Sequence, residues 1–152
     1  MSDELSDACR TGDVARVQAC IARGVDVNSK CSLGKTPLIE AVSHDRPEIV
    51  RLLLARDELY IGEYDFGETA LHYACLKGSA GSVALLGQDR RMTSQIINMR
   101  DITGETALML AVYDGHLSCV EEMAKLDGVD WEMKNGKEES LEDVARWAFT
   151  IS

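Results

Sequence analysis

Leucines recur along this chain at a nearly constant spacing. Successive leucines are 33, 33, 37 and 33 residues apart, at Leu5, Leu38, Leu71, Leu108 and Leu141. A pair of small or apolar residues follows each of them three and four positions later, at Ala8-Cys9, Ala41-Val42, Ala74-Cys75, Ala111-Val112 and Val144-Ala145. A fixed period of about 20–50 residues indicates stacked copies of one structural unit. These columns of residues are therefore predicted to form a continuous core.

Length and composition agree with a folded chain of stacked units. The 152 residues suit a single domain, and 45% hydrophobic residues are too many for a disordered chain. The most apolar segment, residues 49–55, is short and interrupted by Arg51, so we expect no membrane span. The first ten residues lack the basic-then-apolar pattern of a secretory signal, which predicts a cytoplasmic or nuclear protein.

Charge and cysteine usage narrow the possible partners and cofactors. A net charge of −10 argues against nucleic acid and anionic membranes, which would be repelled. A partner protein with a basic or apolar segment is easier to accommodate, and we expect the chain itself to be a monomer. The five cysteines are odd in number and none are spaced as Cys-x-x-Cys, so they suggest neither a disulfide framework nor a zinc site. No cofactor is expected.

Three segments carry a resemblance to a known family. TPLIEAV at 36–42, TALHYAC at 69–75 and TALMLAV at 106–112 resemble the Thr-Pro-Leu-His-x-Ala-Ala signature of ankyrin repeats. The segment GVDVNSKCSLGKTPL at 24–38 is similar to the hairpin between such repeats. Period, signature and hairpin agree independently over nearly the whole chain.

The resemblance implies an all-α fold, an ankyrin-repeat solenoid of stacked helix-turn-helix units with β-hairpin-like fingers. One domain, 1–152, would hold repeats at about 1–32, 33–65, 66–102 and 103–135 and a capping helix at 136–152. The threonine of each signature is placed to cap a first helix, with Pro37 in the first helical turn. Gly12, Gly78 and Gly115, with Asp45 in the second unit, are expected to end the first helices. Second helices are predicted at 14–22, 47–55, 81–86 and 117–126.

Two departures from the family pattern stand out. In the second hairpin, LYIGEYDFGETAL, Ile61 occupies the asparagine position matched by Asn28 and Asn98, so we expect an altered turn. The third unit is four residues longer, within GQDRRMTSQ at 87–95. Either its second helix is longer by about one turn, or Gly87 ends the helix and residues 89–91 project as a loop.

Few residues suggest a catalytic or metal-binding site. His72 and Cys75, three apart on one helical face, could pair as a base and a nucleophile. Their positions in the family signature and in the core column favour structural roles instead, so no catalytic residue and no enzyme activity is predicted. His44 and His116 lack a third group at ligand spacing, so no metal site is predicted either.

Ankyrin proteins typically bind other proteins through the finger tips and the exposed side of the first helices, which line a concave groove. Carrying these positions over predicts a partner-binding surface made by Leu33, Lys35, Phe66, Glu68, Tyr73, Leu76, Lys77, Ile102, Glu105, Tyr113 and Asp114. Its apolar members could form a hot spot rimmed by charge. Alternatively, Leu33 and Ile102 only pack finger against finger.

The sequence favours a non-enzymatic module for protein–protein interaction and leaves two narrower functions open. One is a small inhibitor of a target enzyme such as a kinase, and the other is an adaptor fragment of a larger scaffold protein. Between Glu121 and Arg146, nine acidic residues stand against four basic ones. This run either steers a basic partner or is a solvated surface. Trp131 and Trp147 could be buried or exposed.

Overall fold

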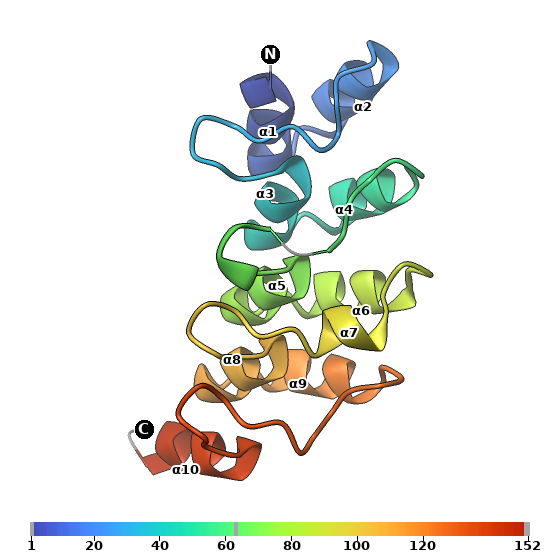
Figure 1. The fold of residues 1–152 in the computed structure, drawn as a ribbon. Helices are drawn as coiled ribbons and strands as arrows, with labels where there is room; N and C mark the ends of the chain where they lie inside the picture. The colour runs from blue at the N-terminus through green and yellow to red at the C-terminus, as the bar shows by residue number, and fades with distance from the viewer. Residues whose placement is uncertain (1, 63, 151–152) are drawn as a thin grey trace. The chain divides into compact units, whose positions relative to one another are not determined.

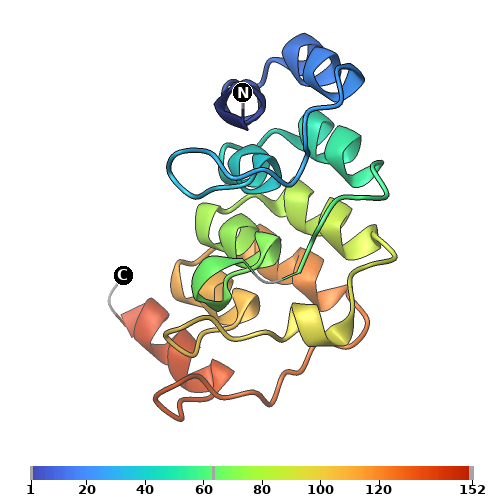
Figure 2. The same ribbon diagram turned by 45° about the horizontal axis from the view of Figure 1, so that its top comes forward.

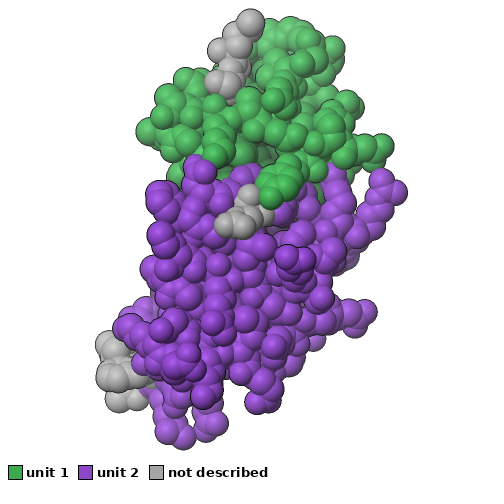
Figure 3. Space-filling model, viewed as in Figure 1, with its two compact units in different colours: residues 1–60 green, residues 61–152 purple. Residues whose placement is uncertain are grey.

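The structure, a computed structural model, describes residues 2–62 and 64–150, with side chains for 3–62 and 64–146. This part of the chain is helical and contains no β-strand, which confirms the predicted all-α fold class. Its contacts divide the chain into two compact units, residues 1–60 and residues 61–152 (Figure 3). No helix of the described residues is long and apolar enough to cross a membrane.

Unit 1 consists of two helix pairs. Its helices are α1 (Ser2–Thr11), α2 (Val14–Ala22), α3 (Pro37–Ser43) and α4 (Pro47–Leu54) (Figure 1). First helices pack on each other, α1 against α3, and α2 likewise contacts α4. The shared core contains the fully buried leucines Leu5 and Leu38 and the small residues that follow each of them. This is the stacking that the leucine period predicted.

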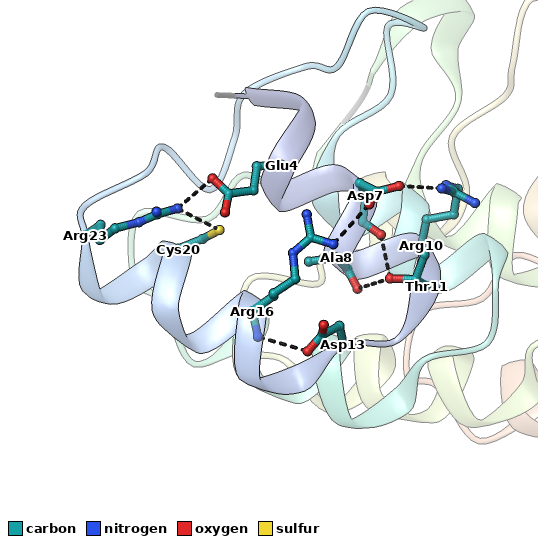
Figure 4. Close-up of polar contacts among 9 residues, drawn as sticks. All are labelled: Glu4, Asp7, Ala8, Arg10, Thr11, Asp13, Arg16, Cys20 and Arg23. Carbon is teal, nitrogen blue, oxygen red and sulfur yellow. Dashed lines mark hydrogen bonds and ion pairs between the residues drawn. The ribbon is translucent and has the colours of Figure 1, made fainter.

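Charged residues tie the first helix pair together on its outer side (Figure 4). Arg23 pairs with Glu4 at 2.7 Å, and Arg16 pairs with Asp7 at 3.1 Å. Arg10 also pairs with Asp7, so one carboxylate serves two arginines. Hydrogen bonds from these arginines lower the pKa values of Glu4 and Asp7. Exposed ion pairs contribute little to stability, so the network adds mainly polar contacts between α1 and α2 at the surface.

Unit 2 stacks first helices on one side and second helices on the other (Figures 1 and 2). Its helices are α5 (Ala70–Lys77), α6 (Ala80–Gln88), α7 (Ser94–Ile97), α8 (Ala107–Tyr113), α9 (Leu117–Ala124) and α10 (Leu141–Thr150). Helix α8 packs between α5 and α10, and α6 packs on α9. The second helices of both units begin and end within two residues of their predicted bounds.

The predicted helix ends are confirmed. Thr36, Thr69 and Thr106 cap α3, α5 and α8, each accepting the backbone N–H three residues on. Because the first-turn N–H groups have no intrahelical acceptor, each threonine hydroxyl satisfies one of them. Asp45, in the position held elsewhere by glycine, has a φ of 52°. It takes the left-handed conformation that glycine adopts more easily and aspartate tolerates.

The fingers are short loops closed by one repeated backbone hydrogen bond. The N–H of the first residue donates to the carbonyl four residues on, at Cys31–Lys35, Tyr64–Glu68, Asp101–Glu105 and Asn135–Glu139, over 2.7–3.0 Å. In unit 2 the fingers touch through their backbones. A Cβ on Gly104, for example, would lie 2.4 Å from the nitrogen of Gly136. Glycine is required there by close approach as well as by its φ of 83°.

The second finger has the altered turn that its sequence predicts. Its residues Asp65–Gly67 form a short 3₁₀ helix, η1, in which Phe66 has a φ of 64° and Gly67 a φ of 73°. Two consecutive left-handed residues are unusual, and a bulky one among them is strained. The carbonyl of Phe66 accepts the N–H of Ile102 at 2.7 Å, which joins this finger to the next.

The hairpin asparagines act as clamps between neighbouring repeats. Asn28 donates to the carbonyl of Glu58 at 2.7 Å and accepts from the N–H of Tyr60 at 2.8 Å. Asn98 makes the same two contacts, over the same distances, with Gly128 and Asp130. Ile61, at the equivalent position of the second repeat, is instead buried in the apolar core.

The four extra residues of the third unit follow neither predicted form. Helix α6 runs through Gly87 to Gln88 without gaining a turn, and the chain then bends around Asp89. The remaining residues form a separate one-turn helix, α7, which is capped by Thr93. The carboxylate of Asp89 accepts hydrogen bonds from the backbone and the guanidinium of Arg91 and so holds the bend.

The last element departs from the leucine column. Ser140, the N-cap of α10, accepts the N–H of Asp143 and stands 34 residues after Thr106, so the true interval here is one residue longer than the leucine spacing. Leu141 and Ala145 are consequently only half-buried, whereas Val144 is buried as the column of small and apolar residues predicted. Trp131 is 45% exposed. The side chain of Trp147 lies outside the described residues.

Candidate partner-binding surface

The predicted surface residues fall into two groups, one on each compact unit. Leu33 and Lys35 belong to the finger of unit 1, where Leu33 is 80% exposed and Lys35 half-buried. The others all belong to unit 2: Phe66, Glu68, Tyr73, Leu76, Lys77, Ile102, Glu105, Tyr113 and Asp114. Unit 2 therefore carries most of the candidate surface by itself.

Exposed apolar side chains cluster at the finger tips of unit 2. Phe66 is 68% exposed and Ile102 is 74% exposed. The hydrogen bond between their backbones places these two residues on adjoining fingers. Large apolar side chains left in solvent on neighbouring tips are typical of a contact surface.

The first helices of unit 2 also carry exposed apolar side chains near their ends. Tyr113, at the end of α8, is 58% exposed, and Leu76, near the end of α5, is 39% exposed. Lys77 and Asp114 are exposed beside them. Tyr73 is more constrained, because its hydroxyl donates to the carboxylate of Glu68, and burial and that carboxylate raise its pKa. Tyr73 and Glu68 thus tie the second finger to α5.

A pocket of about 230 Å³ lies between α8, α10 and the fourth finger. Its lining residues are Glu105, Leu110, Tyr113, Asn135, Lys137, Glu139 and Val144. Only Glu105 and Tyr113 were predicted from the sequence. Leu110 lies within the signature segment 106–112, and the remaining four lie beyond it. A comparison of NGKEES at 135–140 with DITGET at 101–106 would have located the fourth finger, because both end in a helix-capping hydroxyl residue.

His72 is a structural residue. Its ring is buried and bridges two repeats: the N–H of Thr69 donates to Nδ1 at 3.0 Å, so the ring proton is on Nε2, which donates to the carbonyl of Glu105 at 3.0 Å. Burial lowers the pKa of His72, which keeps the ring neutral. Neither nitrogen is available to act as a base toward a substrate.

Cys75 lacks the features of a nucleophile. A hydrogen bond with Cys119 and burial raise the pKa of its thiol well above the usual range, which disfavours the reactive thiolate. His44 and His116 each contact a helix carbonyl, of Glu40 and Leu76 respectively. Within residues 2–62 and 64–150, no group of three or more histidine, cysteine or acidic side chains could hold a metal ion.

Comparisons with known proteins point to one family. The family model for ankyrin repeats (3 copies) matches residues 5–95 and 57–135. The chain is 35% identical to NF-kappa-B inhibitor alpha of Sus scrofa over 103 residues, which are 66% of this chain and 32% of the relative. It is 33% identical to the B-cell lymphoma 3 protein homolog of Mus musculus over 120 residues, covering 76% of this chain and 26% of the relative.

A plant relative shows a similar extent of match. The E3 ubiquitin-protein ligase XBAT33 of Arabidopsis thaliana is 27% identical over an alignment of 151 positions that covers 84% of this chain and 29% of the relative. The chain thus spans about a third or less of the length of these curated relatives.

Proposed function

The chain belongs to the ankyrin-repeat family, and from this premise we propose that it is a non-enzymatic module that binds a partner protein through the fingers and first helices of unit 2. Ankyrin repeats mediate protein–protein interaction. The single observation that carries the proposal is the exposure of Phe66, Ile102 and Tyr113 at finger and helix-end positions where the repeat scaffold does not require apolar residues. Leu33, Lys35, Leu76, Lys77 and Asp114 belong to the proposed surface as peripheral contacts.

Two narrower forms of this function are supported by the relatives. An inhibitor that blocks its target is supported by the likeness to NF-kappa-B inhibitor alpha. An adaptor segment is supported by the relatives in which the part that matches this chain is less than a third of a longer chain. In either case we place the protein in the cytoplasm or nucleus, as a monomer that binds neither nucleic acid nor membranes.

Affinity capture with matched variants tests the proposal. A Phe66→Glu/Tyr113→Glu variant should lose the proteins captured by the wild type from cells that express this protein, because each glutamate places a charge in an apolar contact. The control is Leu117→Glu, since Leu117 is 58% exposed, like Tyr113, but starts α9 away from the fingers. Circular-dichroism melts should coincide for all three proteins. Retained capture by the double variant, or equal loss in the control, contradicts the proposal.

A further inference from the structure

The pocket beside α10 has a charge arrangement that the fold does not explain. Asn135 is 1% exposed, and its Nδ2 donates to Glu105 at 3.1 Å and to Glu139 at 2.8 Å. Its Oδ1 accepts the N–H groups of Lys137 and Glu139, which fixes the amide in place. One neutral amide thus holds two carboxylates next to each other on the same wall of the pocket.

The two carboxylates are not neutralised by the chain itself. Among the described residues, neither Glu105 nor Glu139 has an ion-pair partner within 4.0 Å. Lys137 is the one basic residue of the lining, and its side chain is exposed. Burial raises the pKa of Glu105, and the charges of Asp101 and Glu139 add to this effect, while the hydrogen bond from Asn135 and the charge of Lys137 oppose it only in part. The pocket therefore has an unfilled preference for a cation.

The remaining walls are apolar and aromatic. Leu110 and Val144 line the pocket, Val144 being 3% exposed, and the ring of Tyr113 stands at its edge. A guanidinium group matches this combination, because it donates to carboxylates in a fixed planar fork and stacks on aromatic rings. Its three-carbon stem would lie along the apolar wall.

We infer that this pocket binds an arginine side chain of the partner protein, with the guanidinium between Glu105 and Glu139 and against the ring of Tyr113. The inference rests on the proposed function and specifies the partner's chemistry at one position. It also gives one residue of the acidic run between Glu121 and Arg146, Glu139, a specific role in binding in addition to keeping the surface solvated.

A direct binding measurement tests the pocket without the partner. The probe is N-acetyl-arginine amide, titrated into the ¹⁵N-labelled full chain and followed by amide chemical shifts. We expect saturable shifts at the side-chain amide of Asn135 and the backbone of Lys137 and Glu139. The neutral isostere N-acetyl-citrulline amide should not reproduce them, and N-acetyl-lysine amide should bind more weakly.

Matched charge variants distinguish binding of the probe in this pocket from general attraction of a cation to an acidic protein. The Glu105→Gln/Glu139→Gln variant should bind the probe at least about ten-fold more weakly, because the substitutions remove two charge-assisted hydrogen bonds to the guanidinium. Glu121→Gln/Glu132→Gln removes the same charge from exposed positions and should leave binding unchanged. The inference is overturned by absent or non-saturable shifts, by equal citrulline binding, or by equal weakening in both variants. If capture still depends on Phe66 and Tyr113 after such a result, only the arginine pocket fails and the proposed function stands.

Discussion

At the scale of single residues, His72 shows how a polar side chain can serve packing alone. Both ring nitrogens contact backbone groups, so the imidazole joins its own helix cap to the finger of the next repeat. Met109 occupies the same position one repeat later, where its sulfur lies 3.5 Å from the N–H of Thr106. The methionine retains a weak form of the cap contact but has no donor for the next finger.

This comparison predicts the effect of His72→Met. The variant should lose about 1–2 kcal/mol of unfolding free energy at about pH 7.5, since one donor is lost and a carbonyl is left without it. The folded-state pKa of His72 is below its unfolded value, so stability is fully present above about pH 6.5 and falls as the pH drops toward the folded-state pKa. The His72→Met variant has no imidazole at this position, so it should not show this fall in stability at low pH. Urea unfolding at about pH 7.5 and 5.5 should therefore show a smaller difference between the two proteins at the lower pH, and a constant difference contradicts the assignment.

The candidate site was only partly predictable at this scale. Exposure of Phe66, Ile102 and Tyr113 followed from their family positions, because finger tips and helix ends face solvent. The sequence could not reveal that Asn135 binds two carboxylates, since Glu105 and Asn135 are 30 residues apart and meet only through stacking. The tie between Tyr73 and Glu68 depends likewise on the unusual shape of one finger.

At the scale of elements, the repeated units were predictable and the insertion was not. Helix starts are encoded locally by threonine caps, and helix ends by glycine or Asp45. After Gln88 two short-range contacts decide the path of the chain, the Asp89–Arg91 contact and the Thr93 cap. Both are local signals, but they lie in the segment that makes this unit four residues longer, so the repeat pattern did not point to them.

In the second finger, Phe66 has both a strained backbone and an exposed aromatic ring. Substitutions at this position can separate the effect of the backbone from that of the ring. Phe66→Gly should stabilise the protein by about 0.5–1 kcal/mol relative to Phe66→Ala, because only glycine adopts a φ of 64° without a steric cost. Both variants remove the ring and should weaken partner capture equally. Equilibrium unfolding of the two variants measures the backbone effect, and equal stability would show that the left-handed conformation is not strained.

At the scale of the whole molecule, stability is a sum of local terms within each compact unit. Helix pairs bury their apolar faces against neighbouring pairs, as α8 does between α5 and α10 within unit 2. The clamps Asn28 and Asn98 act within residues 1–60 and 61–152 respectively. Repeat proteins of this kind open locally, because each repeat contacts only its neighbours.

The two clamps form a matched pair that tests this local character. Asn28→Ala removes the acceptor of the Tyr60 amide, and Asn98→Ala removes the acceptor of the Asp130 amide, both at 2.8 Å in the wild type. Each variant should lose about 1–2 kcal/mol, and hydrogen exchange should accelerate mainly in the unit that carries it. Asn28→Asp retains the acceptor but loses the donor to Glu58, so the Tyr60 amide should stay more protected than in Asn28→Ala. Equal acceleration throughout residues 1–152 in either alanine variant would show instead that the chain opens as one cooperative body.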